Sequence, residues 1–338
     1  MKSHKIRLME VCGTHTMAIA SAGIKRLLPD TIELISGPGC PVCVTSQEDI
    51  DRAVKIATQK DVIMTTFGDM MRVPGSSGSL DDARRKGADV RVVYSPLDAL
   101  GIAEENPGKR VIFMGIGFET TSPTIAASVI QAKERDLRNF FLLSNFKLIF
   151  PALEMLSRSK KVKVDGFICP GHVSVVTGST PYQRIASRFK KPCVITGFDP
   201  VDIIKGITCL VRQVVKGKAC VEIEYKRVVK KKGNLKARRA LRRVFSVCDA
   251  RWRGLGSIKK SGLRLRREYA RFDAEKEFKV KVPRVKEPKG CLCGEVLQGI
   301  HSPLDCRLFK KVCTPRNPVG PCMVSSEGTC AAYYKYGK

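Results

Sequence analysis

Hydrophobic positions in the first two thirds of the chain fall into short apolar runs, separated by segments with helical spacing of apolar residues. Such runs predict buried strands joined by amphipathic helices. The predicted strands are Ile6–Val11, Thr31–Ile35, Val62–Thr66, Val90–Tyr94, Val111–Gly115, Phe140–Ser144, Gly166–Cys169 and Cys193–Thr196. Because strands alternate with helices, we expect parallel sheets covered by helices, which is an α/β fold.

Polar residues mark the starts of several predicted helices. Thr45 and Glu48 have the spacing of a capping box, and the apolar residues that follow share one helical face. Ser95 and Ser122 each precede a proline, as an N-cap residue does when proline occupies the first turn.

The pattern changes near residue 216, where strand signals fade and positive charge rises. Between Lys226 and Arg271 there are 18 Lys or Arg and 2 Asp or Glu, so 16 of the chain's 29 net positive charges lie there. Apolar residues such as Leu241 and Val244 have helical spacing in this basic stretch, which predicts a solvated helical face, with RNA binding as the alternative.

We therefore predict two parallel-sheet α/β domains, 1–95 and 96–215, followed by a third part, 216–338, that holds the basic helical segment and a cysteine-rich domain. Pro283 to Lys289 has the composition of a linker between the last two.

The composition indicates the cellular compartment in which the protein is expected. The chain has no apolar run long enough for a membrane span, and no hydrophobic segment follows the basic residues at its N-terminus, so we expect a cytoplasmic protein. Structural disulfides do not persist in that compartment, so its 14 cysteines indicate metal binding, redox chemistry or packing.

Residues with reactive side chains follow the predicted strands. They are Cys12, His15, Cys40, Cys43, Glu119 and His172. Ligands of open α/β sheets bind at the carboxyl ends of the strands, so we expect these side chains to belong to a functional site.

Two pairs of these residues could bind a metal ion. Cys40 and Cys43 lie before a predicted helix whose N-terminus favours a thiolate, and this pair can form a disulfide or bind one metal ion. Cys12 and His15 would complete a sulfur and nitrogen site for Fe(II) or Zn(II). Glu119 and His172 could transfer protons there, although a capping or buried structural role explains each equally well.

The tail contains a second constellation. Four cysteines among Gly and Pro residues are typical ligands of a [4Fe–4S] cluster. Structural zinc sites generally use close cysteine pairs, which the chosen four lack. We predict Cys293, Cys306, Cys313 and Cys330 as the cluster ligands, with Cys291 and Cys322 as alternatives.

At this point the motifs resemble those of one family, the hydrogenase maturation proteins HypD, in order along nearly the whole chain. The motifs are Cys12-Gly-Thr-His15, Gly37-Pro-Gly-Cys-Pro-Val-Cys-Val-Thr45, Phe67-Gly-Asp-Met-Met-Arg-Val-Pro74, Gly117-Phe-Glu-Thr-Thr121, Pro170-Gly-His-Val-Ser174, Trp252-Arg-Gly-Leu-Gly256 and the tail from Gly320 to Tyr334.

The resemblance implies a scaffold for assembling the Fe(CN)₂CO unit of [NiFe] hydrogenases. It implies a stable complex with HypC, transient contact with HypE as the cyanide donor, and transfer of the unit to the hydrogenase large subunit. The resemblance also implies that Cys12 helps to hold the iron and that Cys40 and Cys43 form a redox-active dithiol. The transient cofactor would be Fe(II) with CN and CO ligands, beside a resident [4Fe–4S] cluster. Such a scaffold lies at the border of what is called an enzyme.

One position departs from the family pattern, because Met17 stands where a second histidine is usual. A thioether is a poor ligand for Fe(II) in such a site. Two alternatives also stay open at this point: an iron–sulfur enzyme that modifies RNA, which the basic stretch would serve, and a general dithiol oxidoreductase, which would need no iron at Cys12. We do not expect a nucleic-acid or membrane partner.

Overall fold

The computed structural model describes residues 5–283 and 287–337, and they form two compact units, each assembled from separate stretches of the chain. The first unit contains the chain up to Cys43, Ile149–Leu235 and the chain from Lys289 onward. The second contains Val44–Leu148 and Lys236–Pro288. This division differs from the three consecutive domains expected above, because the N-terminal strands pair with strands that follow residue 160. Residues 284–286 of the expected linker lie outside the described residues.

The first unit is built on a five-stranded parallel sheet with the order β2-β1-β7-β8-β9. Its strands are β1 (Ile6–Glu10), β2 (Ile32–Ser36), β7 (Gly166–Cys169), β8 (Cys193–Ile195) and β9 (Val221–Ile223). Its helices before the tail are α1 (Gly13–Ser21), α2 (Ile24–Leu27), α3 (Pro41–Val44), α8 (Ile149–Arg158), α9 (Gly171–Thr177), η2 (Thr180–Tyr182), α10 (Gln183–Phe189) and α11 (Pro200–Val215).

The core of this unit follows from apolar strands packed on helical stripes. Leu8 in β1 pairs with Leu34 in β2 and with Gly166 in β7, and Leu8 is fully buried. Ile203 and Leu210 of α11 are buried in the same cluster, since their spacing places both on one side of the helix.

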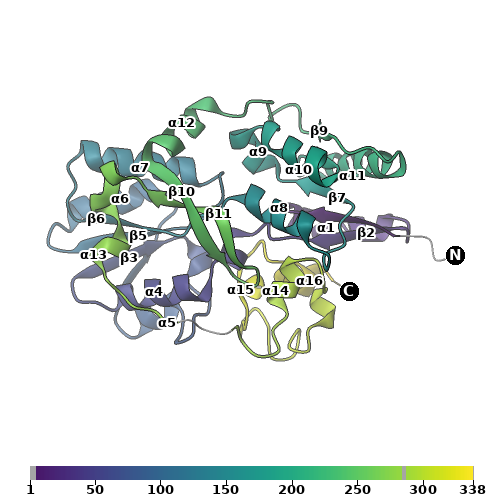
Figure 1. Ribbon diagram of the computed structural model, residues 1–338. Helices are drawn as coiled ribbons and strands as arrows, with labels where there is room; N and C mark the ends of the chain where they lie inside the picture. Colours follow the sequence, from purple (N-terminus) through teal and green to yellow (C-terminus); the bar gives the residue numbers. More distant parts are fainter. Residues whose placement is uncertain (1–4, 284–286, 338) are drawn as a thin grey trace. The chain divides into compact units, whose positions relative to one another are not determined.

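The tail folds onto the first unit. It contains α14 (Cys293–Leu297), η4 (Pro303–Asp305), α15 (Pro321–Val324) and α16 (Thr329–Tyr336). Helix α16 lies against α1, so residues more than 300 positions apart become neighbours (Figure 1).

The second unit has a four-stranded parallel sheet with the order β4-β3-β5-β6 and a separate antiparallel hairpin. The strands are β3 (Val62–Thr66), β4 (Asp89–Val92), β5 (Arg110–Gly115), β6 (Phe140–Ser144), β10 (Phe245–Trp252) and β11 (Gly256–Leu265). The helices are α4 (Gln47–Ala57), η1 (Gly68–Met70), α5 (Leu80–Arg85), α6 (Pro96–Glu105), α7 (Ser122–Glu134), α12 (Leu235–Val244), η3 (Arg267–Phe272) and α13 (Ala274–Glu277).

All eight predicted strands are present, and the two parallel sheets confirm the α/β prediction. The cysteine-rich tail is also present as expected, whereas its iron–sulfur content stays a prediction. Among the helix starts, Ser95 caps α6 ahead of Pro96, as predicted.

Two helix-start predictions were wrong. The capping box of α4 is formed by Ser46 and Asp49, one residue after the predicted pair. Helix α7 has Thr121 at its N-cap, and the Ser122 hydroxyl instead donates to the Phe118 carbonyl.

The basic stretch is only partly helical, so the prediction of a helical segment there needs correction. Helix α12 ends at Val244, and the following residues form the β10–β11 hairpin. Phe245, which shares the helical spacing of Leu241 and Val244, is the first residue of β10 and packs with Val244 in the core of the unit. Buried residues at the ends of the hairpin fix it to the core, although its middle is largely polar.

None of the helices within the described residues is long and apolar enough to cross a membrane.

Candidate functional site

Cys12 lies where β1 ends and α1 begins. Its extended backbone places it at the N-cap of α1, and its side chain is buried. Burial raises the pKa of the Cys12 thiol to about 11, the nearby Glu327 carboxylate adds to the rise, and the backbone N–H groups of His15 and Thr14 oppose it. Without a cation beside it, this thiol keeps its proton near neutral pH, and a bound metal ion would take the place of that proton.

His15, in the first turn of α1, is fully buried. Its Nε2 atom lies 2.8 Å from the Gly197 carbonyl oxygen and 2.9 Å from the Thr196 hydroxyl. Because a carbonyl only accepts hydrogen bonds, Nε2 must carry the proton, and Nδ1 then bears the lone pair.

That lone pair has no hydrogen-bond partner among the described residues. Burial lowers the pKa of His15 to about 4, so the ring is neutral at physiological pH. A neutral imidazole with one nitrogen fixed by a carbonyl is the form in which histidine binds metal ions. His15 therefore has the protonation state that the predicted metal site requires.

Phe198 connects His15 to His172. The Phe198 ring lies between the two imidazoles, with centroid distances of 4.7 Å to His15 and 4.1 Å to His172. His172 is an exposed residue, but the neighbouring side chains shield part of its ring from water, and this loss of solvation lowers the pKa of His172. His172 and His15 thus contact the same side chain, Phe198, which we did not single out from the sequence.

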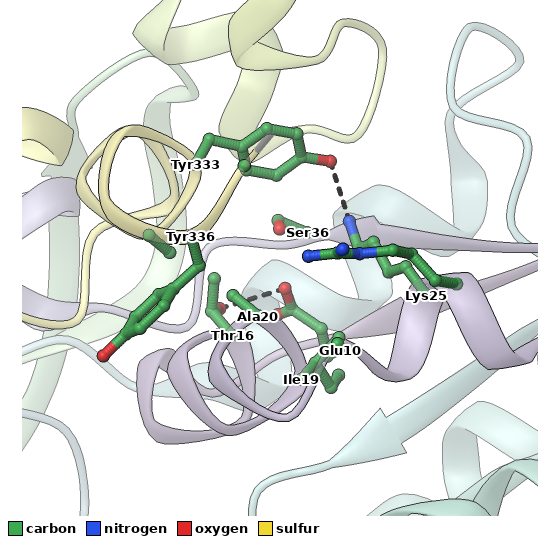
Figure 2. A pocket seen from close by; sticks show the side chains of 12 residues that line it. Glu10, Thr16, Ile19, Ala20, Lys25, Ser36, Tyr333 and Tyr336 are labelled. Atoms are coloured by element: carbon green, nitrogen blue, oxygen red, sulfur yellow. Dashed lines mark hydrogen bonds between the residues drawn. The ribbon is translucent and has the colours of Figure 1, made fainter.

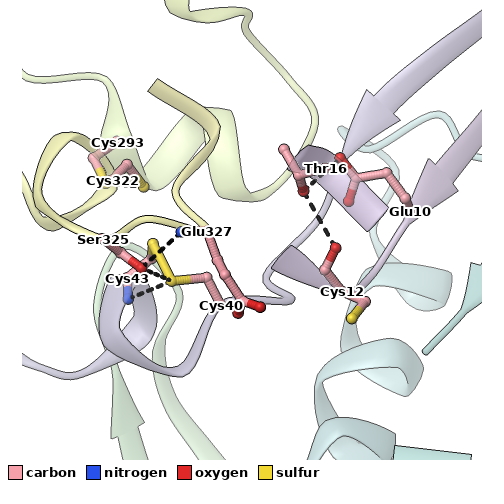
Figure 3. Close-up of a disulfide and its surroundings, with 9 residues drawn as sticks. All are labelled: Glu10, Cys12, Thr16, Cys40, Cys43, Cys293, Cys322, Ser325 and Glu327. Carbon is pink, nitrogen blue, oxygen red and sulfur yellow. Dashed lines mark hydrogen bonds between the residues drawn. A yellow bond between two sulfur atoms is a disulfide. The ribbon is translucent and has the colours of Figure 1, made fainter. Parts of the chain in front are cut away.

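Cys40 and Cys43 form a disulfide and are both buried (Figure 3). Their α-carbons lie 5.2 Å apart, and the Cys43 N–H donates to the Cys40 sulfur over 3.1 Å. Short helix α3, which starts directly after Cys40, holds the pair at this spacing. The pair is thus in the disulfide form, one of the two options left open by its spacing, and its redox role stays a prediction.

The loop that carries this pair is interlocked with the loop of Cys12. The Gly13 N–H donates to the Gly39 carbonyl over 3.0 Å, and the Gly37 N–H donates to the Glu10 carbonyl over 2.8 Å. A β-carbon on Gly39 would overlap the backbone of Cys12. Only glycine permits this approach, and it brings the two cysteine loops together as predicted.

The segment before α16 joins the tail to both loops. The Ser325 hydroxyl lies 3.4 Å from the Cys40 sulfur, to which it can donate. The Glu327 N–H donates to the Ser325 hydroxyl (Figure 3). The Glu327 carboxylate accepts a 2.6 Å hydrogen bond from Thr14. Ser325 and Glu327 were not singled out from the sequence, although both lie in the tail motif that carries the family resemblance.

All six tail cysteines line one pocket whose other lining residues are chiefly apolar. They are the predicted ligands Cys293, Cys306, Cys313 and Cys330 and the alternatives Cys291 and Cys322. Residues 5–283 and 287–337 contain no group of three or more side chains already arranged around a metal ion. The donor set nevertheless fits a thiolate-bound cluster, since it offers sulfur atoms with few competing oxygen or nitrogen donors.

Cys322 is as well placed as the predicted ligands. Its sulfur lies 2.8 Å from that of Cys293. Interactions with the Cys293 and Cys330 thiols, together with burial, raise the pKa of Cys322 far above its usual value. Burial also raises the pKa of Cys313. Crowded, protonated thiols become thiolates readily only when a cation replaces the protons, as a cluster does.

Glu119 belongs to the second unit, where it is buried beyond the carboxyl end of β5. Cys12, Cys40, Cys43 and the six tail cysteines belong to the first unit, as do His15 and His172. A proton-transfer role for Glu119 or His172 stays a prediction. Met17 lies in α1 and is partly exposed.

The family model HypD, described as "Hydrogenase formation hypA family", matches residues 1–337. Hydrogenase maturation factor HypD of Escherichia coli K12 is 48% identical over 332 residues, covering 98% of this chain and 89% of that protein.

Hydrogenase maturation factor HypD2 of Bradyrhizobium diazoefficiens is 46% identical over 340 residues, covering 98% of this chain and 90% of that protein. A putative hydrogenase expression/formation protein of Methanocaldococcus jannaschii is 45% identical over 335 residues, covering 99% of this chain and 93% of that protein.

Proposed function

Because the chain belongs to the HypD family of hydrogenase-formation proteins, we propose that it is a hydrogenase maturation factor. In this role it holds one Fe(II) ion while cyanide and carbon monoxide ligands are added, and it then releases the Fe(CN)₂CO unit toward the large subunit of a [NiFe] hydrogenase.

The observation that carries this proposal is the convergence of Cys12 and the Cys40–Cys43 pair at one end of the first unit's sheet. Interlocked glycine loops hold these groups together, and Ser325 and Glu327 connect them to the tail. A thiol, a dithiol and a neutral imidazole on one α/β sheet match the softness of ferrous iron carrying strong-field ligands.

Iron binding would start with loss of the Cys12 proton, leaving a thiolate as an iron ligand. The N–H groups at the start of α1 favour that thiolate. Nδ1 of His15 is the atom through which His15 would bind, because Nε2 is held by Gly197. Few protein ligands on the iron leave coordination positions for cyanide and carbon monoxide.

The Cys40–Cys43 pair would supply or accept two electrons. Reduction of the disulfide takes two electrons and two protons and gives two thiols. A [4Fe–4S] cluster held by four of the tail cysteines would supply single electrons when bound. Ser325 would orient the Cys40 sulfur, and His172 would hold or deliver protons at the edge of the site.

The partners follow from the same proposal. HypC would bind stably and add a thiolate to the iron, and HypE would deliver cyanide in transient contact. Exposed arginines in the basic stretch, such as Arg239, Arg242 and Arg243, would suit an acidic partner surface.

The test is anaerobic co-purification with HypC, followed by iron analysis and infrared spectroscopy. For the wild-type chain we expect about five irons per chain, four in a cluster and one on the scaffold, together with cyanide and carbon monoxide stretching bands. Cys12→Ala should retain about four irons and the brown cluster absorbance, lose the infrared bands and abolish hydrogenase maturation.

Cys209→Ala is the matched control, because Cys209 is a free cysteine of the same unit, on α11, away from the strand ends. It should behave like the wild-type chain. Infrared bands that survive Cys12→Ala, or brown absorbance that disappears with it, would contradict the division of the cysteines into an iron site and a cluster site. An iron-free chain with active disulfide exchange would instead indicate a general dithiol oxidoreductase.

A further inference from the structure

A second pocket lies in the first unit between α1, the ends of β1 and β2, and α16 (Figure 2). The space that it offers to a water-sized molecule is about 170 Å³. Its polar lining comes from Glu10, Lys25, Arg26, Ser36 and the tyrosines Tyr333 and Tyr336. The proposed function gives none of these side chains a role.

Glu10 is the most unusual of them, because its carboxylate is only 2% exposed. Oε1 accepts a 2.9 Å hydrogen bond from Thr16, but Oε2 has no hydrogen-bond partner within the described part of the chain. Figure 2 shows this carboxylate on the pocket wall. A buried carboxylate oxygen without a hydrogen-bond donor is unfavourable. A ligand with an N–H or ammonium group would remove that cost.

Positive charge lies elsewhere in the lining. The Lys25 ammonium donates a 2.8 Å hydrogen bond to the Tyr333 hydroxyl and lies over the Tyr333 ring (Figure 2). Within the described residues it forms no ion pair with Glu10. The Tyr333 hydroxyl accepts from Lys25 and therefore keeps its own proton to donate to a ligand. With Arg26 also in the lining, this part of the pocket suits an anionic group.

Apolar surface separates the two polar ends. Ile19 and Ala20 of α1 and Ala332 of α16 contribute it, and the Tyr336 ring adds aromatic surface. A ligand that satisfies the whole lining has a cationic donor for Glu10, an anion for Lys25 and Arg26, and a hydrocarbon side chain. A ligand with only positive charge would be repelled by Lys25 and Arg26. A ligand with only negative charge would leave the Glu10 carboxylate without a hydrogen-bond donor.

We propose that this pocket binds an α-amino acid with an apolar or aromatic side chain. The ammonium group binds Glu10, with Ser36 on the same wall, the carboxylate binds Lys25 and Tyr333, and the side chain lies against Ile19 and Ala332. None of the residues that line the pocket is a proposed ligand of the iron or of the cluster.

The test is calorimetric titration of the full-length wild-type chain with L-leucine and L-phenylalanine. Two further probes each lack one charged group of leucine: 4-methylpentanoate has no ammonium, and 3-methylbutylamine has no carboxylate. We expect leucine to bind at least about tenfold more tightly than either, since each lost charged hydrogen bond is worth about 1.5–3 kcal/mol.

Variants then assign the contacts. Glu10→Gln should weaken leucine binding by about tenfold and leave 4-methylpentanoate binding unchanged. Lys25→Met should weaken leucine and 4-methylpentanoate but not 3-methylbutylamine. Lys205→Met, in α11 outside the pocket, is the control and should bind like wild type. Thermal unfolding checks that each variant is folded.

Equal binding of leucine and 4-methylpentanoate would overturn the proposal, because Glu10 would then have no ligand group to bind. So would leucine binding that Lys25→Met and Glu10→Gln both leave unchanged. Absence of saturable binding by either amino acid in the millimolar range would also refute it.

Discussion

Gly39 packs directly on the backbone of Cys12, and its carbonyl oxygen accepts a 3.0 Å hydrogen bond from the next residue, Gly13. The Gly-Pro-Gly loop before Cys40 is thus fixed to the start of α1. The position of the Cys40–Cys43 pair relative to Cys12 depends on a residue that has no side chain, and this gives a direct test of how the two loops are held.

Gly39→Ala should destabilise the chain, because the added methyl group would overlap the nitrogen and α-carbon of Cys12, and backbone atoms cannot rotate away. We expect a loss of about 2–4 kcal/mol in the free energy of unfolding, measured with denaturant. Gly101→Ala in α6 is the control, because a β-carbon there meets nothing within 4 Å. It should stabilise the chain by about 0.5–1 kcal/mol. Equal stability of the two variants would show that the loops are not interlocked.

Ser325→Ala should lower the reduction potential of the Cys40–Cys43 pair. The Ser325 hydroxyl lies 3.4 Å from the Cys40 sulfur, and a donor binds a thiolate more strongly than a disulfide sulfur, so the hydroxyl favours the reduced pair. Loss of a bond worth about 1 kcal/mol corresponds to roughly 20 mV for two electrons.

The potential can be measured by equilibration of the chain with glutathione or dithiothreitol buffers. Ser326→Ala, at the adjacent exposed position, should leave it unchanged. A higher or unaltered potential in Ser325→Ala would rule out the hydroxyl as a donor to Cys40.

His15 should make the metal-free chain sensitive to acid. The pKa of His15 is about 4 in the folded chain, below its ordinary value of 6.5. The unfolded chain therefore binds the proton first as pH falls. Stability from the neutral ring is complete above about pH 6.5 and is lost progressively down to about pH 4, with a total near 3 kcal/mol.

The measurement is denaturant unfolding at several pH values for wild type and His15→Gln. Glutamine does not titrate and retains an N–H donor for the Gly197 carbonyl, so its stability should fall less over this range. His172→Gln is the control, and a smaller effect is expected because that ring is exposed. Parallel curves for wild type and His15→Gln would mean that the pKa of His15 is the same in the folded and the unfolded chain.

The basic stretch should contribute to partner binding through its charge. Arg239, Arg242 and Arg243 of α12 are exposed and Arg238 is partly buried, whereas Leu241 and Val244 of the same helix pack in the core. Charge reversal there should weaken HypC binding by about tenfold at low salt and less at high salt, measured by titration. The variant carries Arg238→Glu, Arg239→Glu, Arg242→Glu and Arg243→Glu, and the control carries Arg135→Glu and Arg138→Glu.

If the four reversals leave HypC affinity unchanged, the partner role of α12 is wrong. Steeply salt-dependent RNA binding that the same variant abolishes would instead support the nucleic-acid alternative.

The sequence alone determined the local structure well. Short apolar runs such as Val111–Gly115 favour buried strands. These runs alternate with segments whose apolar residues have helical spacing, and this order of strands and helices predicted parallel sheets. Six cysteines within one tail rich in Gly and Pro predicted a shared sulfur site, and in the structure all six line one pocket. The motifs around Cys12 and Cys40 also sufficed to identify the family.

Only the tertiary structure decided which distant segments meet. Ser325 reaches Cys40 across 285 positions, and Glu327 reaches Thr14 across 313. No periodicity encodes such contacts, because they arise when α16 packs on α1 and buries surface that neither helix can bury alone. The same packing forms the pocket of Glu10 and Tyr333. The β10–β11 hairpin was hidden for a similar reason, since its polar middle has little apolar alternation and the core contacts at its ends hold it.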